Sequence, residues 1–306
     1  MTKTRDPGMG MSEDQEDYIE QVLDRCRKLI QAGIWEGIQE HRLNGWHGSL
    51  TNCDAGLLGA YLLDNLAFRS RDQYLSLLDA VFDNLSLPVH GASMPLLDLC
   101  RTRSSKANER SIRIAPVIGH LAPPTKSGPY ILRLAQRRYR IESEWLAWPQ
   151  SLASTTGLSH IYFVDDFCGT GEQFTKFMAS INVAEIMRAN PGVHFVYLVT
   201  AIHDDGLGKI STAYPQVEVV WGERLTSANS VLLPAAFDRY RVPGFADLIR
   251  LQYQAAVQHT GLPATGQMAD GFGSLGLAYG FAHATPNNTL PIFWKATSKL
   301  TALLDR

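Results

Sequence analysis

Apolar residues recur at helical spacing through the first third of the chain. One-sided apolar faces of this kind occupy residues 19–30, 57–66, 72–85 and 95–101. No alternating strand pattern precedes residue 110. The pattern predicts an α-helical N-terminal module over residues 12–105, and the polar residues 1–11 are expected to form a flexible tail.

From about residue 110 onward, apolar runs of strand length alternate with helical segments. Strands are expected over residues 112–118, 161–164, 193–202, 217–221 and 275–283. Helices are expected from Pro129, after residue 171 through Ile186, over residues 207–214, 228–240 and 245–259, and after Trp294. Such alternation is typical of a parallel sheet with right-handed crossovers. The predicted fold class is α/β, with a parallel-sheet, Rossmann-like domain over residues 106–306.

Composition narrows the partners that this fold can have. The 306 residues carry a formal net charge of −2, so no overall basic field attracts nucleic acid or anionic membrane. The four cysteines are far apart and lack Cys-x-x-Cys spacing, which suits a reducing compartment better than a disulfide scaffold. No stretch approaches the roughly 20 apolar residues that span a bilayer. We therefore expect a cytoplasmic protein with no membrane partner.

One stretch combines the features of a ligand site. An apolar run over residues 161–164 leads into Asp165-Asp166, then into the turn Gly169-Thr170-Gly171 and a helix that begins with Glu172-Gln173. Ligands of open α/β sheets bind at the carboxyl ends of strands, and the N–H groups of a helix start attract anions. Paired carboxylates can accept hydrogen bonds from sugar hydroxyls. The stretch favours a sugar-phosphate ligand, although an acidic strand end with a glycine turn also occurs in doubly wound proteins without one.

Two further loops offer polar groups. Lys126-Ser127-Gly128 follows the first expected strand of the sheet and supplies a cation, a hydroxyl and an open backbone N–H at a helix start. A serine N-cap with a surface lysine explains the same residues equally well. Asn287-Asn288 stands between two prolines and could read a base edge or a ribose, or could close the loop as Asx-turns.

The acid pair and its turn resemble the binding loop of type I phosphoribosyltransferases. Asp165 and Asp166 match the family's two acids, and Thr170-Gly171 match its turn. The resemblance implies that both aspartates hold the ribose hydroxyls, directly or through water on Mg²⁺, and that Gly169, Thr170, Gly171 and Gln173 surround the 5-phosphate. It also implies that Lys126, Ser127 and Gly128 hold pyrophosphate. Glu172 replaces a small residue of the family, and we expect it to exclude part of the anionic charge or to act as a general base.

The wider layout resembles a phosphoribosyltransferase-like effector family of bacterial conflict systems. The resemblance is carried by residues 164–174, 271–273 and 286–291 together with His283 and Trp294. It implies an anti-phage effector, in some cases encoded beside a retron reverse transcriptase, that acts on nucleotides or nucleic acid by transfer or hydrolysis at ribose C1. It also implies a ligand-binding role for Asn287 and Asn288, and a protein or nucleoprotein partner.

Two other functions fit the same residues. The loop could sense a phosphoribosyl ligand without turning it over, while the helical module meets a partner. The run from Asp165 to Gly171 also resembles the cofactor loop of amino-methyltransferases that act on DNA, but the Asp/Asn-Pro-Pro-aromatic catalytic turn of those enzymes is not found. The sequence leaves open the substrate, catalytic competence, the trigger and the oligomeric state.

Overall fold

A computed structural model describes residues 13–83, 85–89, 92–101, 111–119, 123, 126–240 and 242–306. The chain folds as two compact units. The helical unit consists of Met1–Arg71 and Ser227–Arg306, and the sheet unit consists of Asp72–Thr226. Among the described residues, none of the helices is both long and apolar enough to pass through a lipid bilayer.

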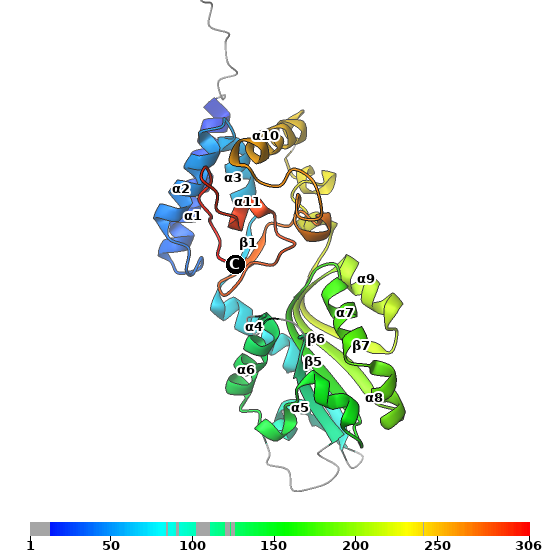
Figure 1. Ribbon diagram of the computed structural model, residues 1–306. Coiled ribbons are helices and arrows are strands. Elements are labelled where there is room, and N and C mark those ends of the chain that lie inside the picture. The colour runs from blue at the N-terminus through cyan, green and yellow to red at the C-terminus, as the bar shows by residue number, and fades with distance from the viewer. Residues whose placement is uncertain are drawn as a thin grey trace, which may run out of the picture. The chain divides into compact units, whose positions relative to one another are not determined.

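The helical unit is built from both ends of the chain. Its elements are α1 (Glu13–Gln31), α2 (Glu40–Thr51), α3 (Gly56–Asp64), β1 (Ala67–Arg69), η4 (Ser227–Asn229), η5 (Pro234–Phe237), α10 (Phe245–Thr260), η6 (Phe272–Ser274), β8 (Tyr279–Phe281) and α11 (Pro291–Trp294) (Figure 1). Strands β1 and β8 pair in parallel, with Phe68 opposite Gly280. The first and last parts of the chain therefore share one small sheet.

A single apolar core joins the two halves of the helical unit. Leu43, Trp46 and Leu50 of α2 are fully buried with Ile292 and Phe293 from the C-terminal segment. The Trp46 indole stacks on Phe293 with ring centroids 5.6 Å apart, and its N–H donates a 2.7 Å hydrogen bond to the carbonyl of Ile292. A buried indole N–H needs such a partner, so this contact fixes the C-terminal segment on α2.

The sheet unit contains four parallel strands in the order β4-β5-β6-β7. Its strands are β2 (Ser86–Val89), β3 (Ala92–Pro95), β4 (Ile112–Pro116), β5 (His160–Cys168), β6 (His194–His203) and β7 (Val217–Leu225). Its helices are α4 (Arg71–Phe82), α5 (Leu96–Cys100), α6 (Ser127–Tyr139), η2 (Ser143–Trp145), η3 (Pro149–Ser154), α7 (Glu172–Ser180), α8 (Val183–Ala189) and α9 (Asp204–Ala213). Strands β2 and β3 form a separate antiparallel hairpin.

Helices cover both faces of the parallel sheet. On one face, aromatic residues of α7 and of the strands form a core in which Phe163 packs edge-on against Phe177 at 5.1 Å. On the other face lie α4 and α6 (Figure 1). There α4 approaches β7 so closely that a Cβ atom placed on Gly222 would lie 2.7 Å from the carbonyl oxygen of Leu77. Strands buried on both faces explain the nearly continuous apolar runs in β5 and β6.

The parallel α/β sheet and the long helices confirm the predicted fold class, while several element predictions are wrong. The first third contains β1, β2 and β3, which are too short to show alternation. The helix expected through Ile186 breaks at Asn182, whose φ is 54°. Residues 228–240 form only the short 3₁₀ turns η4 and η5, because Pro234 interrupts the pattern. The closing helix expected after Trp294 does not form, because α11 ends at Trp294 and residues 295–306 contain no helix.

The last expected strand also has a different partner. Only Tyr279–Phe281 is extended, and it pairs with β1 instead of joining the four-stranded sheet. The domain boundary expected near residues 105 and 106 lies outside the described residues, and the two compact units do not follow it. The reason is that residues 227–306 bury their apolar side chains against the N-terminal helices.

Candidate functional site

The two acidic residues lie inside β5 instead of beyond its end. The strand runs from His160 to Cys168, and Asp165 and Cys168 lie opposite Val199 and Ile202 of β6. Successive side chains of a strand point to opposite faces of its sheet. Asp165 therefore faces α7, and Asp166 faces α6. The two acids still interact, because the charge of Asp166 contributes to the raised pKa of Asp165 and the Asp166 N–H donates to the Asp165 carboxyl group.

Asp165 is enclosed in the core on the α7 side. It is 1% exposed, and the Tyr197 hydroxyl donates a 3.1 Å hydrogen bond to its Oδ2. The Asp166 N–H donates to Oδ1 at 3.1 Å, and the ring of Phe174 stacks on Tyr197 with centroids 3.9 Å apart. Burial, and then the charge of Asp166, raise the pKa of Asp165 well above its usual value. The neutral acid is therefore the favoured form.

Asp166 joins two loops at the carboxyl edge of the sheet. Its Oδ1 accepts a 2.9 Å hydrogen bond from the Ser127 hydroxyl and a 2.8 Å bond from the N–H of Phe167. The Thr200 hydroxyl of β6 donates to its main-chain carbonyl. Burial and the Asp166 charge raise the pKa of Tyr74 in α4, which places that phenol within electrostatic range of the carboxylate. Asp166 is thus a hydrogen-bond acceptor held between α6 and the strands β5 and β6.

The turn after β5 presents main-chain donors at the start of α7. Gly171 has a φ of 73°, a conformation that glycine adopts without strain. Among the described residues, the N–H groups of Thr170, Gln173 and Phe174 have no hydrogen-bond partner. Unpaired donors and the helix dipole together favour an anion at this turn.

The same turn is packed directly against the first turn of α9. A Cβ atom on Gly171 would lie 2.9 Å from the carbonyl oxygen of Gly206, and one on Gly206 would lie 2.8 Å from Sγ of Cys168. Neither glycine leaves room for a side chain. The contact fixes the position of the main-chain donors, which suits a preformed binding loop.

Glu172 forms an ion pair with Lys176 along α7. The hydrogen bond from Lys176 lowers the pKa of Glu172, so the carboxylate is a weaker base than a free glutamate. Gln173 is exposed beside it. The predicted roles of Glu172 as general base and of Gln173 as a ligand remain predictions.

The second loop reaches the site through Ser127. Lys126 occupies the N-cap position of α6 with an exposed side chain, and no side chain caps this helix. A Cβ atom on Gly128 would lie 2.5 Å from the carbonyl oxygen of Val117, so the helix start packs directly on the strand exit. The Ser127 hydroxyl bonds to Asp166 instead of capping the helix. The structure thus brings Ser127 and Asp166, predicted from separate loops, into contact.

The two asparagines belong to the other unit. Asn288 is 4% exposed, and its amide donates a 2.7 Å hydrogen bond to the carbonyl of Phe272. The carbonyl of Asn287 accepts a 2.8 Å bond from the N–H of Phe272. These contacts tie two loops of the helical unit together, and neither of them is the local Asx-turn that the alternative expects. A ligand-binding role for Asn287 and Asn288 remains a prediction.

The carboxylates do not form a metal site by themselves. The described residues contain no group of three or more His, Cys, Asp or Glu that could hold an ion. Asp165 is buried, hydrogen-bonded and best suited to its neutral form, so it does not fit direct coordination. Asp166 alone could supply one oxygen ligand, and Mg²⁺ commonly completes its octahedron with water and substrate phosphate.

Three site residues were missed from the sequence. Tyr197 and Thr200 lie in the apolar run of β6, and Gly206 lies in the turn after it. Tyr197 and Thr200 could have been found from the sequence, because they are polar residues in the strand expected beside the two aspartates. Nothing local in the sequence marks Gly206, because its role depends on the approach of another loop.

Fold and geometry together describe an α/β protein with a candidate ligand site at the carboxyl edge of a parallel sheet. The chain belongs to the PRTase-CE family, whose model matches residues 46–306. It is therefore phosphoribosyltransferase-like by family.

Solved structures and curated proteins add little to this assignment. The chain is similar to an orotate phosphoribosyltransferase from Aeropyrum pernix, with 17% identity, a TM-score of 0.28, and coverage of 50% of this chain and 71% of that chain. It is also similar to the AQ2163 protein from Aquifex aeolicus, with 13% identity, a TM-score of 0.28, and coverage of 61% and 83%. No curated protein matches.

Proposed function

We propose that this protein binds a phosphoribosyl compound or nucleotide at the carboxyl end of β5. The observation that carries the proposal is the 2.9 Å hydrogen bond between Ser127 and Asp166, which joins the two loops that such a ligand requires. Membership of the PRTase-CE family supports the same class of ligand. The reaction, where one occurs, is transfer or hydrolysis at ribose C1.

Each group of the site has a role that follows from its position. Asp166 accepts hydrogen bonds from the ribose hydroxyls, because it is the anionic member of the pair. The N–H groups of Thr170, Gln173 and Phe174 hold the phosphate at the start of α7. Lys126, which is exposed beside Ser127, adds a positive charge for a second phosphate. Asp165 is a positioning residue that holds Tyr197 beneath the turn.

In this proposal, Asp166 is the one residue that would bind Mg²⁺. The ion would neutralise phosphate charge when the ligand is bound, and one carboxylate oxygen is enough to anchor it alongside the ligand's own oxygens. We therefore expect Mg²⁺ to strengthen ligand binding without binding tightly on its own.

The biological role that we propose is that of an anti-phage effector that acts on nucleotides or nucleic acid. Support for this role comes from the residue resemblance in the 164–174 and 286–291 segments. A non-catalytic sensor is the second candidate. One observation favours the sensor: the acidic side chains of the site already have partners within the protein. Asp165 and Asp166 accept hydrogen bonds from Tyr197 and Ser127, and Glu172 is paired with Lys176.

The test is calorimetric titration with phosphoribosyl pyrophosphate, ribose 5-phosphate and S-adenosylmethionine, with and without Mg²⁺. We expect saturable binding of phosphoribosyl pyrophosphate that Asp166→Asn weakens by about tenfold or more, since a hydrogen bond to a charged group contributes roughly 1.5–3 kcal/mol. Asp98→Asn is the matched control, because Asp98 is an exposed carboxylate of α5 in the same unit. Equal binding by wild type and Asp166→Asn, or binding of S-adenosylmethionine alone, would contradict the proposal.

Incubation with the bound compound separates the two candidates. Release of pyrophosphate or free base, measured by chromatography, identifies an enzyme. Saturable binding with no product over long incubation identifies a sensor.

A further inference from the structure

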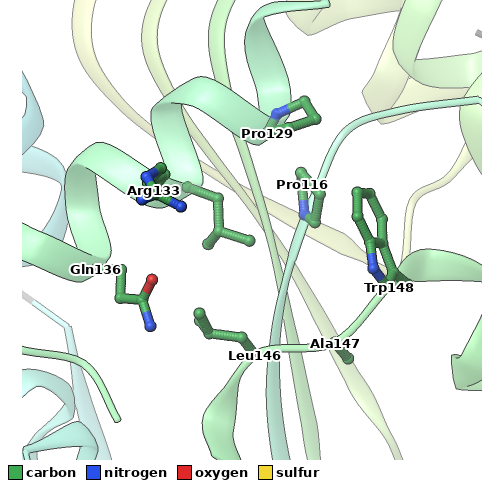
Figure 2. Close-up of a pocket in the computed structure, with 8 residues that line it drawn as sticks. Pro116, Pro129, Arg133, Gln136, Leu146, Ala147 and Trp148 are labelled. Carbon is green, nitrogen blue, oxygen red and sulfur yellow. The ribbon is translucent and has the colours of Figure 1, made fainter. Parts of the chain in front are cut away.

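A groove of about 390 Å³ lies at the outer edge of the parallel sheet, in the sheet unit. Its walls are α6 and the segment from Leu146 to Trp148, and Pro116 lies between them at the end of β4 (Figure 2). The residues that line it are Pro116, Pro129, Leu132, Arg133, Gln136, Leu146, Ala147 and Trp148. None of the acid-pair or glycine-turn residues is among them.

The fold builds this groove from an incomplete strand pairing. The N–H of Ala147 donates a 3.0 Å hydrogen bond to the carbonyl of Ile114, and Leu146 forms a single parallel bridge with Ile114. The segment then turns away into η3 at Pro149, which leaves the Trp148 side chain beside the strand edge. Trp148 is 61% exposed, the largest exposure of any described tryptophan. An indole left so exposed is available for stacking.

Helix α6 supplies the opposite wall with regular spacing. Pro129, Leu132, Arg133 and Gln136 follow the i, i+3, i+4, i+7 pattern, so they share one face of the helix. Figure 2 shows Arg133 and Gln136 on the side opposite Trp148. The apolar part of the groove is thus bordered by an aromatic ring at one side and by polar groups at the other.

The charge of the groove favours an anion. Arg133 forms no ion pair with any described residue, and none of the eight lining residues is acidic. The Gln136 amide donates to the Ser143 hydroxyl at 3.3 Å, which fixes the amide while its carbonyl oxygen can still accept. A planar ring, a cation and a fixed amide are the groups that recognise a nucleobase and its phosphate.

We propose that this groove is a second ligand site that binds a mononucleotide, with its base against Trp148 and its phosphate at Arg133. The volume lies within the range of about 300–1,000 Å³ that small-molecule sites have. A nucleotide uses the aromatic ring, the cation and the amide together, whereas an apolar peptide would leave Arg133 and Gln136 unused. The inference does not depend on the proposed function, because the two sites share no residue.

Intrinsic fluorescence tests the proposal directly. Titration of the intact protein with AMP, GMP and UMP should give saturable quenching of tryptophan fluorescence. Trp148→Phe should remove this quenching, because Trp221, which is 38% exposed, does not line the groove. Calorimetry should show about a tenfold or greater loss of affinity in Trp148→Ala and in Arg133→Ala. Arg137→Ala is the matched control, because Arg137 is an exposed arginine of α6 that does not line the groove.

The acid-pair site supplies the control for location. With ribose 5-phosphate present to occupy the acid-pair site, quenching of Trp148 by mononucleotides should be unchanged, because ribose 5-phosphate has no base to stack on the ring. The proposal is overturned by the absence of saturable binding at millimolar nucleotide, by equal binding in Arg133→Ala and Arg137→Ala, or by loss of the Trp148 quenching when ribose 5-phosphate is present. Binding of a proline-rich peptide in place of nucleotides would also overturn it. Circular dichroism melts confirm that each variant is folded.

Discussion

The hydroxyl of Tyr197 donates to Oδ2 of Asp165, so a tyrosine of one strand completes the hydrogen bonding of an acid buried in the next. Burial, and then the charge of the neighbouring Asp166, raise the pKa of this carboxyl group. The functional site therefore contains two adjacent aspartates with opposite characters. One is enclosed with Tyr197 on the α7 side of the sheet, and the other bonds to Ser127 on the α6 side.

Asp165 should make the protein less stable as the pH rises. Its folded-state pKa exceeds the unfolded value, so the folded state holds the proton more tightly. Stability is then greatest below the unfolded pKa and falls as the pH rises toward the folded pKa. Asp165→Asn keeps the acceptor for Tyr197 but removes the titration. We expect the variant to gain stability relative to wild type as pH increases, measured by urea unfolding between pH 5 and 9. A difference that does not change with pH would contradict this prediction.

Tyr197→Phe should lower the free energy of unfolding by about 1–3 kcal/mol, because it leaves a buried carboxyl oxygen without its donor. The stacking with Phe174 is retained, so the loss reports on the hydroxyl alone. Tyr214→Phe is a suitable comparison, since it removes a longer, partly buried hydrogen bond to the carbonyl of Thr175 in the same unit. Urea midpoints measure both. A smaller cost for Tyr197→Phe than for Tyr214→Phe would show that Asp165 does not depend on the phenol.

Gly206→Ala should disturb the binding turn. The added methyl group would meet Sγ of Cys168 at 2.8 Å and would also overlap the carbonyl oxygen of Gly169. Both atoms belong to the packed turn, so we expect the turn to shift and phosphoribosyl binding to weaken. Gly208→Ala, two residues along α9, meets nothing within 4 Å and should be neutral or stabilising by up to about 1 kcal/mol. Equal binding by the two variants would show that the turn tolerates displacement.

In the helical unit, Asp64 should contribute stability that is lost in acid. It accepts hydrogen bonds from Tyr18 at 3.2 Å, Arg239 at 2.8 Å and Tyr240 at 2.6 Å, and it pairs with Arg25. Burial acts to raise its pKa, but the hydrogen bonds from Tyr240 and Arg25 outweigh burial and lower it. Its stabilisation is therefore present above the unfolded pKa and disappears as the pH falls through the folded pKa.

Asp64→Asn should cost about 1–3 kcal/mol at pH 7 and less near pH 3. Thermal melts over this pH range measure the difference. Asp247→Asn, at a widely exposed carboxylate of α10 in the same unit, should leave the melting temperature nearly unchanged at both pH values. A cost for Asp64→Asn that stays constant down to pH 3 would contradict the assignment.

Sequence patterns predicted the long elements well and the short ones poorly. Helix α1 and strand β6 carry enough periodic residues to be identified alone. Strand β1 has only three residues, and its pairing with β8 depends on a segment more than 200 residues away. Helical spacing over residues 228–240 favoured a helix, but local turns and Pro234 determine the structure there. Pairing between distant segments cannot be recognised from the residues of one short stretch of sequence.

The site was predicted in outline, and its inner arrangement was not. The contact between Ser127 and Asp166 follows from the rule that parallel strands end at one edge. Asp165 and Asp166 point to opposite faces of the sheet because β5 continues to Cys168. The two acids made the strand seem to end before them, so the sequence pattern did not indicate this. The groove at Trp148 left no signal, because it arises from an isolated bridge to Ile114.

The stacking of Trp46 on Phe293 also sets an order of events during translation. The ribosome makes all of the sheet unit before it makes Phe293, so residues 72–226 can fold while α2 still lacks its partner. The face of Trp46 that stacks on Phe293 then stays uncovered until Phe293 is made. A release of the chain shortly before Ile292 would leave Trp46 without both the carbonyl that accepts from its indole and the ring on which it stacks.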